Sequence, residues 1–150
     1  MRPESVHITL KFLGDVEINK IEEIAQMVQT VSKNHTSFSL TIEGTGVFPN
    51  GRNPRVLWVG IQQGAEEITA LASQIENGLV ELGYPKEKRA YSPHLTIGRI
   101  RSSRGIDATL KAMNQMEFQG EPFRVEEILI MQSELQPSGA VYTPLKKIKL

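Results

Sequence analysis

Two short segments of this chain share a residue pattern that could do chemistry. The chain has three histidines, and two of them, His7 and His94, are each followed two residues later by a threonine. These threonines are Thr9 and Thr96. Both segments alternate polar and apolar residues, as half-buried β-strands do. Residues i and i+2 of a strand project from the same face, so each segment presents an imidazole beside a hydroxyl.

Two such strands set side by side would surround one pocket with two imidazoles and two hydroxyls, which suits metal-free opening of a strained cyclic phosphodiester. A neutral imidazole takes a proton from the attacking water, and a cationic imidazole protonates the departing sugar oxygen. Imidazole fits both tasks because the pKa of histidine in model peptides is about 6.5. Threonine hydroxyls can donate hydrogen bonds to the non-bridging phosphate oxygens. A single His-x-Thr strand is more often a polar outer face, but the doubled pattern favours a site.

The histidines allow two other interpretations. A zinc site would need a further ligand such as a carboxylate, but none shares a strand face with His7 or His94. The helical H-E-x-x-H pattern is also absent, so we reject this interpretation. The third histidine, His35, follows a predicted helix and is most simply a solvated turn residue.

Three basic residues could lie near the site, and a tryptophan is expected in the core. Lys11 shares a strand face with His7, which predicts either a place at the rim of the site or an exposed strand end. Trp58 lies in an apolar strand and is most simply a core residue. Arg101 and Arg104 could form a small basic patch that attracts phosphate.

Composition limits the classes of function that are possible. The chain of 150 residues has the size of one domain. Its 17 basic and 17 acidic residues give a formal net charge of zero, which argues against bulk electrostatic binding to long nucleic acids. The absence of cysteine excludes thiolate catalysis and disulfides, and makes the cytoplasm the expected location. No apolar run approaches the roughly 18 residues of a membrane helix, so we expect no membrane partner.

Hydrophobic periodicity predicts an α+β fold with a mostly antiparallel sheet. A period of two residues predicts strands over 6–12, 38–42, 55–61, 91–97, 123–133 and 140–148. Helical spacing of apolar residues predicts helices over 18–34, 68–82 and 107–116.

Four segments, in the same order along the chain, carry a resemblance to a known family. They are residues 2–15 (RPESVHITLKFLGD), 46–50 with 54–60 (GVFPN and PRVLWVG), 92–99 (SPHLTIGR) and 133–145 (SELQPSGAVYTPL). With these segments the chain resembles the two-histidine (2H) phosphoesterases, and most closely the bacterial and archaeal RNA 2′,3′-cyclic phosphodiesterases of the 2′-5′ RNA ligase family.

The resemblance implies a role for each residue of the two motifs. His7 would protonate the leaving 3′ oxygen, and His94 would be the base that activates water. Thr9 and Thr96 would bind phosphate oxygens, and the product would be an RNA 2′-phosphomonoester, formed with no metal or organic cofactor. The family also places an arginine after the second motif, which is Arg99 here. Strict alternation from His94 would send Arg99 to the opposite face, so we predict that a bulge or strand end at Gly98 turns it toward the phosphate.

The resemblance also implies an architecture. Two pseudo-symmetric lobes with mostly antiparallel sheets would surround a central cleft, with helices on the outer faces and one motif strand from each lobe. Residues 1–150 would form a single 2H phosphoesterase domain that lacks the family's usual first strand and helix. Such a domain would expose an unpaired sheet edge, and the sequence leaves its oligomeric state open.

Two further functions fit the same motifs, because the motifs contact only the phosphate. The substrate could be a small cyclic nucleotide or an ADP-ribose cyclic phosphate in place of an RNA end. Alternatively, the chain could be a non-catalytic module that binds nucleotides through the same side chains.

Overall fold

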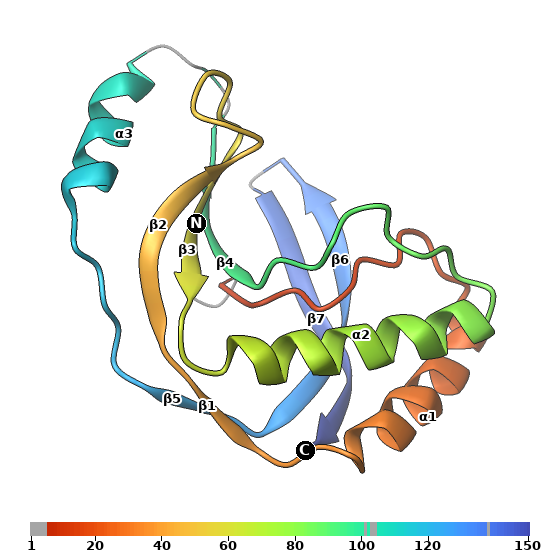
Figure 1. The fold of residues 1–150 in the computed structure, drawn as a ribbon. Helices are drawn as coiled ribbons and strands as arrows, with labels where there is room; N and C mark the ends of the chain where they lie inside the picture. Colours follow the sequence, from red (N-terminus) through yellow and green to blue (C-terminus); the bar gives the residue numbers. More distant parts are fainter. Residues whose placement is uncertain (1–5, 101, 103–104, 138) are drawn as a thin grey trace. The chain divides into compact units, whose positions relative to one another are not determined.

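The computed structural model describes residues 6–100, 102, 105–137 and 139–150, drawn as a coloured ribbon in Figure 1. The chain divides into two compact units, each assembled from three separate stretches of sequence. Unit 1 comprises residues 1–9, 39–65 and 93–123, and unit 2 comprises residues 10–38, 66–92 and 124–150. Both His-x-Thr segments therefore belong to unit 1.

Unit 1 is built on an antiparallel sheet in the order β2–β3–β4 (Figure 1). Its strands are β2 (Ile42–Phe48), β3 (Val56–Ile61) and β4 (His94–Arg99). Helix α3 (Ile106–Gln115) lies beside β2, where the Thr45 hydroxyl donates a 3.1 Å hydrogen bond to the Met113 carbonyl. At the other edge of the sheet, Ile8 forms an isolated antiparallel bridge with Leu95 of β4.

Unit 2 packs two helices against a hairpin. The first helix is α1 (Ile21–Ser32), which follows the 3-10 turn η2 (Ile18–Lys20). The second helix is α2 (Ala65–Glu81). The hairpin consists of the antiparallel strands β6 (Glu127–Gln136) and β7 (Gly139–Lys149). The two helices and both strands of the hairpin contribute to one buried apolar cluster: Ile24, Ala25, Val28, Leu71, Ile75, Leu79, Ile128 and Ile148. Gly78 lets the helices approach closely, because a Cβ there would lie 2.8 Å from Met27 Cγ.

Two short strands lie where the sequence passes from one unit to the other. They are β1 (Phe38–Leu40) and β5 (Phe123–Val125), which pair with each other.

The α+β class with antiparallel sheets is confirmed, and the predicted helices lie within three residues of those observed. The strand predicted over residues 6–12 is not formed. Only Ile8 forms a bridge, and Phe12 is 72% exposed. The reason is that Thr9 is the last residue of this stretch in unit 1, while Leu10 packs against the core of unit 2. The arrangement also differs from one motif strand per lobe, because the Ile8–Leu95 bridge joins both motifs in unit 1.

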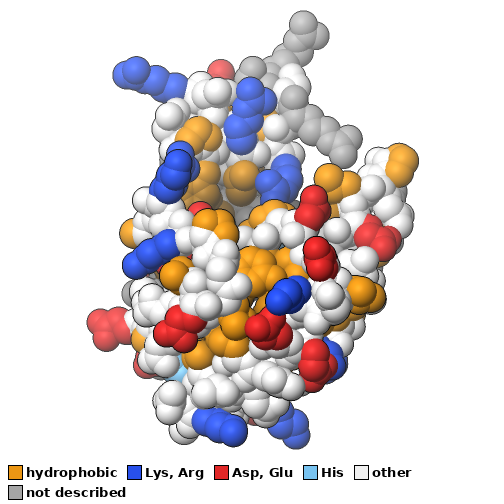
Figure 2. All heavy atoms as spheres, turned by 90° about the vertical axis from the view of Figure 1, so that its right-hand side faces the viewer, with side chains coloured by type: hydrophobic (Ala, Val, Ile, Leu, Met, Phe, Trp, Pro, Cys, Tyr) orange, Lys and Arg blue, Asp and Glu red, His pale blue; other side chains and the backbone are white. Residues whose placement is uncertain are grey.

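The surface carries charges of both signs. Figure 2 shows Lys and Arg side chains interspersed with Asp and Glu on the face that it draws, with hydrophobic side chains between them. This mixture agrees with the zero formal net charge of the chain. Among the described residues, no helix combines the length and the hydrophobicity that crossing a lipid bilayer requires.

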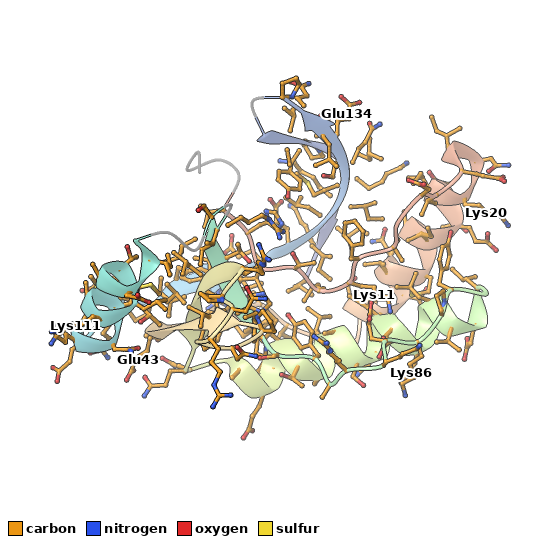
Figure 3. The ribbon with its side chains drawn as sticks, turned by 90° about the horizontal axis from the view of Figure 1, so that it is seen from above. Lys11, Lys20, Glu43, Lys86, Lys111 and Glu134 are labelled. Atoms are coloured by element: carbon orange, nitrogen blue, oxygen red, sulfur yellow. The ribbon has the colours of Figure 1, made fainter. Side chains whose placement is uncertain are left out.

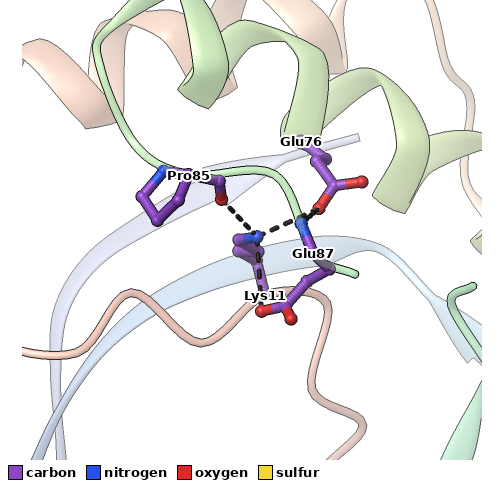
Figure 4. A network of polar contacts seen from close by, with 4 residues as sticks. All are labelled: Lys11, Glu76, Pro85 and Glu87. Atoms are coloured by element: carbon purple, nitrogen blue, oxygen red, sulfur yellow. Dashed lines mark hydrogen bonds and ion pairs between the residues drawn. The ribbon is translucent and has the colours of Figure 1, made fainter. Parts of the chain in front are cut away.

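Lys11 belongs to an ionic network of unit 2, so the exposed strand end predicted for it is wrong, while a place at the rim of the site stays a prediction. Its ammonium Nζ donates hydrogen bonds to Glu76 Oε1 and the Pro85 carbonyl, both at 3.0 Å, and lies 3.3 Å from Glu87 Oε1 (Figure 4). The side chain of Lys11 is only 7% exposed. Two hydrogen-bond acceptors and a second carboxylate thus stabilise a buried ammonium group. Figure 3 shows Lys11 beside α2, while Lys111 lies on α3 and Glu134 on the β6–β7 hairpin.

Acid is expected to destabilise unit 2 through Glu76. The Glu87 backbone N–H, at 2.8 Å, and Lys11 hold the pKa of this carboxyl below its ordinary value of 4.5. A carboxylate with a lowered folded-state pKa stabilises the fold above its unfolded-state pKa, and this contribution is lost as the pH falls through the folded-state value. The Glu76→Gln variant should therefore unfold at lower denaturant concentration at pH 7 and differ less from the parent below about pH 4.

The matched control for Glu76→Gln is Glu81→Gln, which changes an exposed carboxylate near the end of the same helix. The urea unfolding midpoints of the parent and both variants, measured from about pH 3 to pH 7, test this prediction. If Glu76→Gln and Glu81→Gln show the same midpoints throughout, the network adds nothing to stability.

Candidate active site

The two motif segments meet at the bridge between Ile8 and Leu95. Both side chains point to one face of the sheet, because partners in an antiparallel pair share a face. The residues on either side of each partner project from the other face, since side chains alternate along an extended chain. One apolar pair thus fixes the register of all four polar motif residues.

This register brings the four polar motif side chains together. Antiparallel geometry makes His7 the cross-strand neighbour of Thr96, and Thr9 the neighbour of His94. Cross-strand neighbours have Cβ atoms about 4.5–5.5 Å apart, and diagonal pairs, such as the two histidines here, are roughly 7–8 Å apart. His7 and Thr9 are exposed, while His94 and Thr96 are half-buried. The two histidines thus share one face of the sheet, and His7 and Thr9 are open to solvent there.

An irregularity in β4 decides where Arg99 points. Trp58 pairs with Thr96 and Leu57 pairs with Gly98, so Ile97 is one extra residue in β4. Val56 then pairs with Arg99. Because Val56 and Trp58 share a face of β3, the extra residue places Arg99 on the face of Thr96. This is the face that the sequence predicted for Arg99, and its role there stays a prediction.

Aromatic rings pack on the His94 side of the site. The rings of Phe48 and His94 meet edge to face, with centroids 5.0 Å apart and planes at 80°. The ring of Trp58 lies 5.3 Å from that of Phe48, centroid to centroid. Trp58 also lies flat over Gly46, its partner on β2. Edge-to-face pairs are a preferred aromatic arrangement, so this stack restricts how the imidazole of His94 can turn.

The sequence did not indicate Phe48 as a functional residue, and it predicted a core position for Trp58. Trp58 is half-buried on the same face as Thr96, not a fully buried core residue. Phe48 lies in the segment GVFPN, which carried part of the family resemblance, and this was the available signal. Arg101 and Arg104, predicted as a basic patch, lie outside the described residues.

Comparison with known proteins identifies the family. A sequence profile described as the 2′-5′ RNA ligase superfamily matches residues 2–137. The chain belongs to the 2′-5′ RNA ligase superfamily. This assignment confirms the resemblance to 2H phosphoesterases that the motifs predicted.

Individual members of the superfamily match along nearly the whole chain. An RNA 2′,3′-cyclic phosphodiesterase of Methanothermobacter thermautotrophicus is 34% identical, over 100% of this chain and 81% of the relative. A protein of the same name from Aquifex aeolicus is 35% identical, over 100% of this chain and 80% of its own length.

Solved structures show the same fold. A structure from Thermus thermophilus has a TM-score of 0.83 at 27% identity, over all of this chain and 80% of that one. The apo form of Escherichia coli LigT has a TM-score of 0.76 at 22% identity, over 99% of this chain and 78% of that one.

Proposed function

We propose that this member of the 2′-5′ RNA ligase superfamily hydrolyses RNA ends that carry a 2′,3′-cyclic phosphate, giving 2′-phosphomonoesters. One observation carries the proposal: the Ile8–Leu95 bridge sets two His-x-Thr segments side by side, with all four polar side chains on one face. Relatives at 34% and 35% identity, named RNA 2′,3′-cyclic phosphodiesterases, support the assignment as an enzyme of this kind.

The proposed reaction uses the two histidines in opposite protonation states. Neutral His94 accepts a proton from water as the water oxygen bonds to phosphorus. The bond between phosphorus and the 3′ oxygen breaks, and cationic His7 donates a proton to that oxygen. The phosphate stays on the 2′ oxygen, and a proton returns from His94 to His7 through solvent before the next turnover. No metal ion or organic cofactor has a role in these steps.

The other polar residues stabilise charge. The hydroxyls of Thr9 and Thr96 donate hydrogen bonds to the non-bridging phosphate oxygens, and the guanidinium of Arg99 faces the same oxygens. Negative charge grows on these oxygens in the transition state, so fixed donors lower the barrier. The cyclic phosphate requires a ribose 2′ oxygen, which excludes DNA as a substrate. We place the reaction in the cytoplasm, in keeping with the cysteine-free composition.

Product analysis tests this function directly. The protein is incubated with a nucleoside 2′,3′-cyclic monophosphate and with a short RNA that ends in the cyclic phosphate, each with and without EDTA. We expect the 2′-phosphate isomer from both, at the same rate with and without the chelator. A 3′-phosphate product, or loss of activity with EDTA, would contradict the mechanism. Binding of a 2′-nucleotide without turnover would identify a nucleotide-binding module, and turnover of ADP-ribose cyclic phosphate alone would redefine the substrate.

Arg99→Ala should lower kcat/KM by roughly 10- to 100-fold, because a hydrogen bond to a charged group contributes about 1.5–3 kcal/mol. Arg99→Lys should recover part of this loss, since it keeps the charge without the paired donors. Arg89→Ala is the control, as it removes an exposed arginine of unit 2. Steady-state rates on the cyclic nucleotide measure all three. Equal rates for Arg99→Ala and Arg89→Ala would remove Arg99 from the site.

A further inference from the structure

The side chain of Phe48 lies between two rings of unit 1. On one side it meets Trp58, at a centroid distance of 5.3 Å and a tilt of 33°. On the other it meets His94 edge to face, at 5.0 Å and 80°. The three rings come from three adjacent strands, β2, β3 and β4. Phe48 therefore joins the catalytic strand β4 to the far strand of the sheet.

Backbone hydrogen bonds hold the end of β2 at Phe48. Phe48 pairs with Val56, and its carbonyl accepts a 2.7 Å hydrogen bond from the Arg55 N–H. The loop that follows is closed by Asn50, whose side-chain oxygen accepts hydrogen bonds from the N–H groups of Arg52 and Asn53, both at 3.1 Å. A strand end held in this way gives the Phe48 ring little freedom to move away from His94.

We propose that Phe48 is a positioning residue for His94: its ring sets the angle at which the imidazole faces the attacking water. The inference rests on the proposed function, in which His94 is the general base. Proton transfer requires the imidazole nitrogen within hydrogen-bond reach of the water, so an imidazole held less firmly spends less time in the reactive geometry. Phe48 touches neither water nor phosphate in this scheme, and its effect reaches the reaction through His94 alone.

The kinetic test replaces Phe48 with leucine and with tyrosine. Phe48→Leu keeps an apolar side chain but removes the ring, and we expect kcat on the cyclic nucleotide to fall about 10-fold while KM changes less than about twofold. Phe48→Tyr keeps the ring and should retain at least half of the parent kcat. Phe12→Leu is the matched control because Phe12 is 72% exposed in unit 2, and its kcat should equal that of the parent.

A second readout does not require activity. In the NMR spectrum, the ring protons of His94 should shift in Phe48→Leu and keep their positions in Phe12→Leu, because the Phe48 ring lies against the imidazole. An unchanged kcat in Phe48→Leu, or an equal loss in Phe48→Tyr, would overturn the positioning role. So would His94 signals that do not respond to Phe48→Leu. If the parent protein itself lacks turnover, the proposed function fails, and the NMR result still decides whether the Phe48 ring lies against His94.

Discussion

His94→Ala and His7→Ala should each lower kcat on a nucleoside 2′,3′-cyclic monophosphate by on the order of 10²–10⁴-fold, the usual contribution of one general acid or base. His7 is exposed and His94 is only half-buried, so both variants should keep the circular dichroism spectrum of the parent. The double variant should lose little more than the worse single one, because a base and an acid that act in one step are not additive. Steady-state kinetics on purified variants measures each loss.

The third histidine supplies the control for this prediction. His35 lies in the turn between α1 and β1, in unit 2, and His35→Ala should leave kcat unchanged. The parent should show a bell-shaped dependence of kcat/KM on pH, and each single variant should lose one limb. A rate that stays flat from about pH 5 to pH 9, or full activity in either histidine variant, would exclude paired acid–base catalysis.

A large loss of stability is expected from Gly46→Ala. A Cβ at this position would overlap ring carbons of Trp58, the farthest of the three lying 2.6 Å away, because the indole lies flat over the glycine. The indole cannot yield without disturbing Phe48, whose ring it meets. Overpacking of this kind costs about 1–3 kcal/mol, and we expect the upper end. Urea unfolding should show this as a lower midpoint.

Gly51→Ala is the control, since nothing lies within 4 Å of a Cβ at that position. It should change the free energy of unfolding by less than about 0.5 kcal/mol. In the background of Trp58→Leu, which removes the overlapping ring, the cost of Gly46→Ala should largely disappear. If Gly46→Ala is as stable as Gly51→Ala, the flat packing of Trp58 over β2 is wrong.

The sequence predicted those parts of the site that local alternation determines. His7 and Thr9 share a face because they are two residues apart, and the same holds for His94 and Thr96. The sequence could not predict which residues pair across strands, because this pairing depends on which strands meet in the fold. Arg99 illustrates this, since its face depends on one extra residue in β4 opposite Leu57. A pattern within β4 alone does not show which residue will be the extra one.

Lys11 and Phe48 show what the sequence could not predict. By alternation Lys11 belongs beside His7, but its acceptors Glu76 and Glu87 lie on α2 and in the loop after it, more than 60 positions away. Phe48 contacts His94 across an intervening strand. Both contacts arise from tertiary packing, so no spacing rule along the chain predicts them. For the same reason, the sequence did not predict that the chain passes from unit 1 to unit 2 after Thr9.

The interleaved course of the chain has a consequence for its synthesis. The segment with His7 leaves the ribosome early, but its partner β4 is complete only at Arg99. At about 5–20 residues per second, roughly 5–20 s pass between the two. During that interval the first motif has no strand to pair with, while α1 and α2 of unit 2 emerge. We therefore expect the face proposed for catalysis to assemble late, after α1 and α2 have left the ribosome.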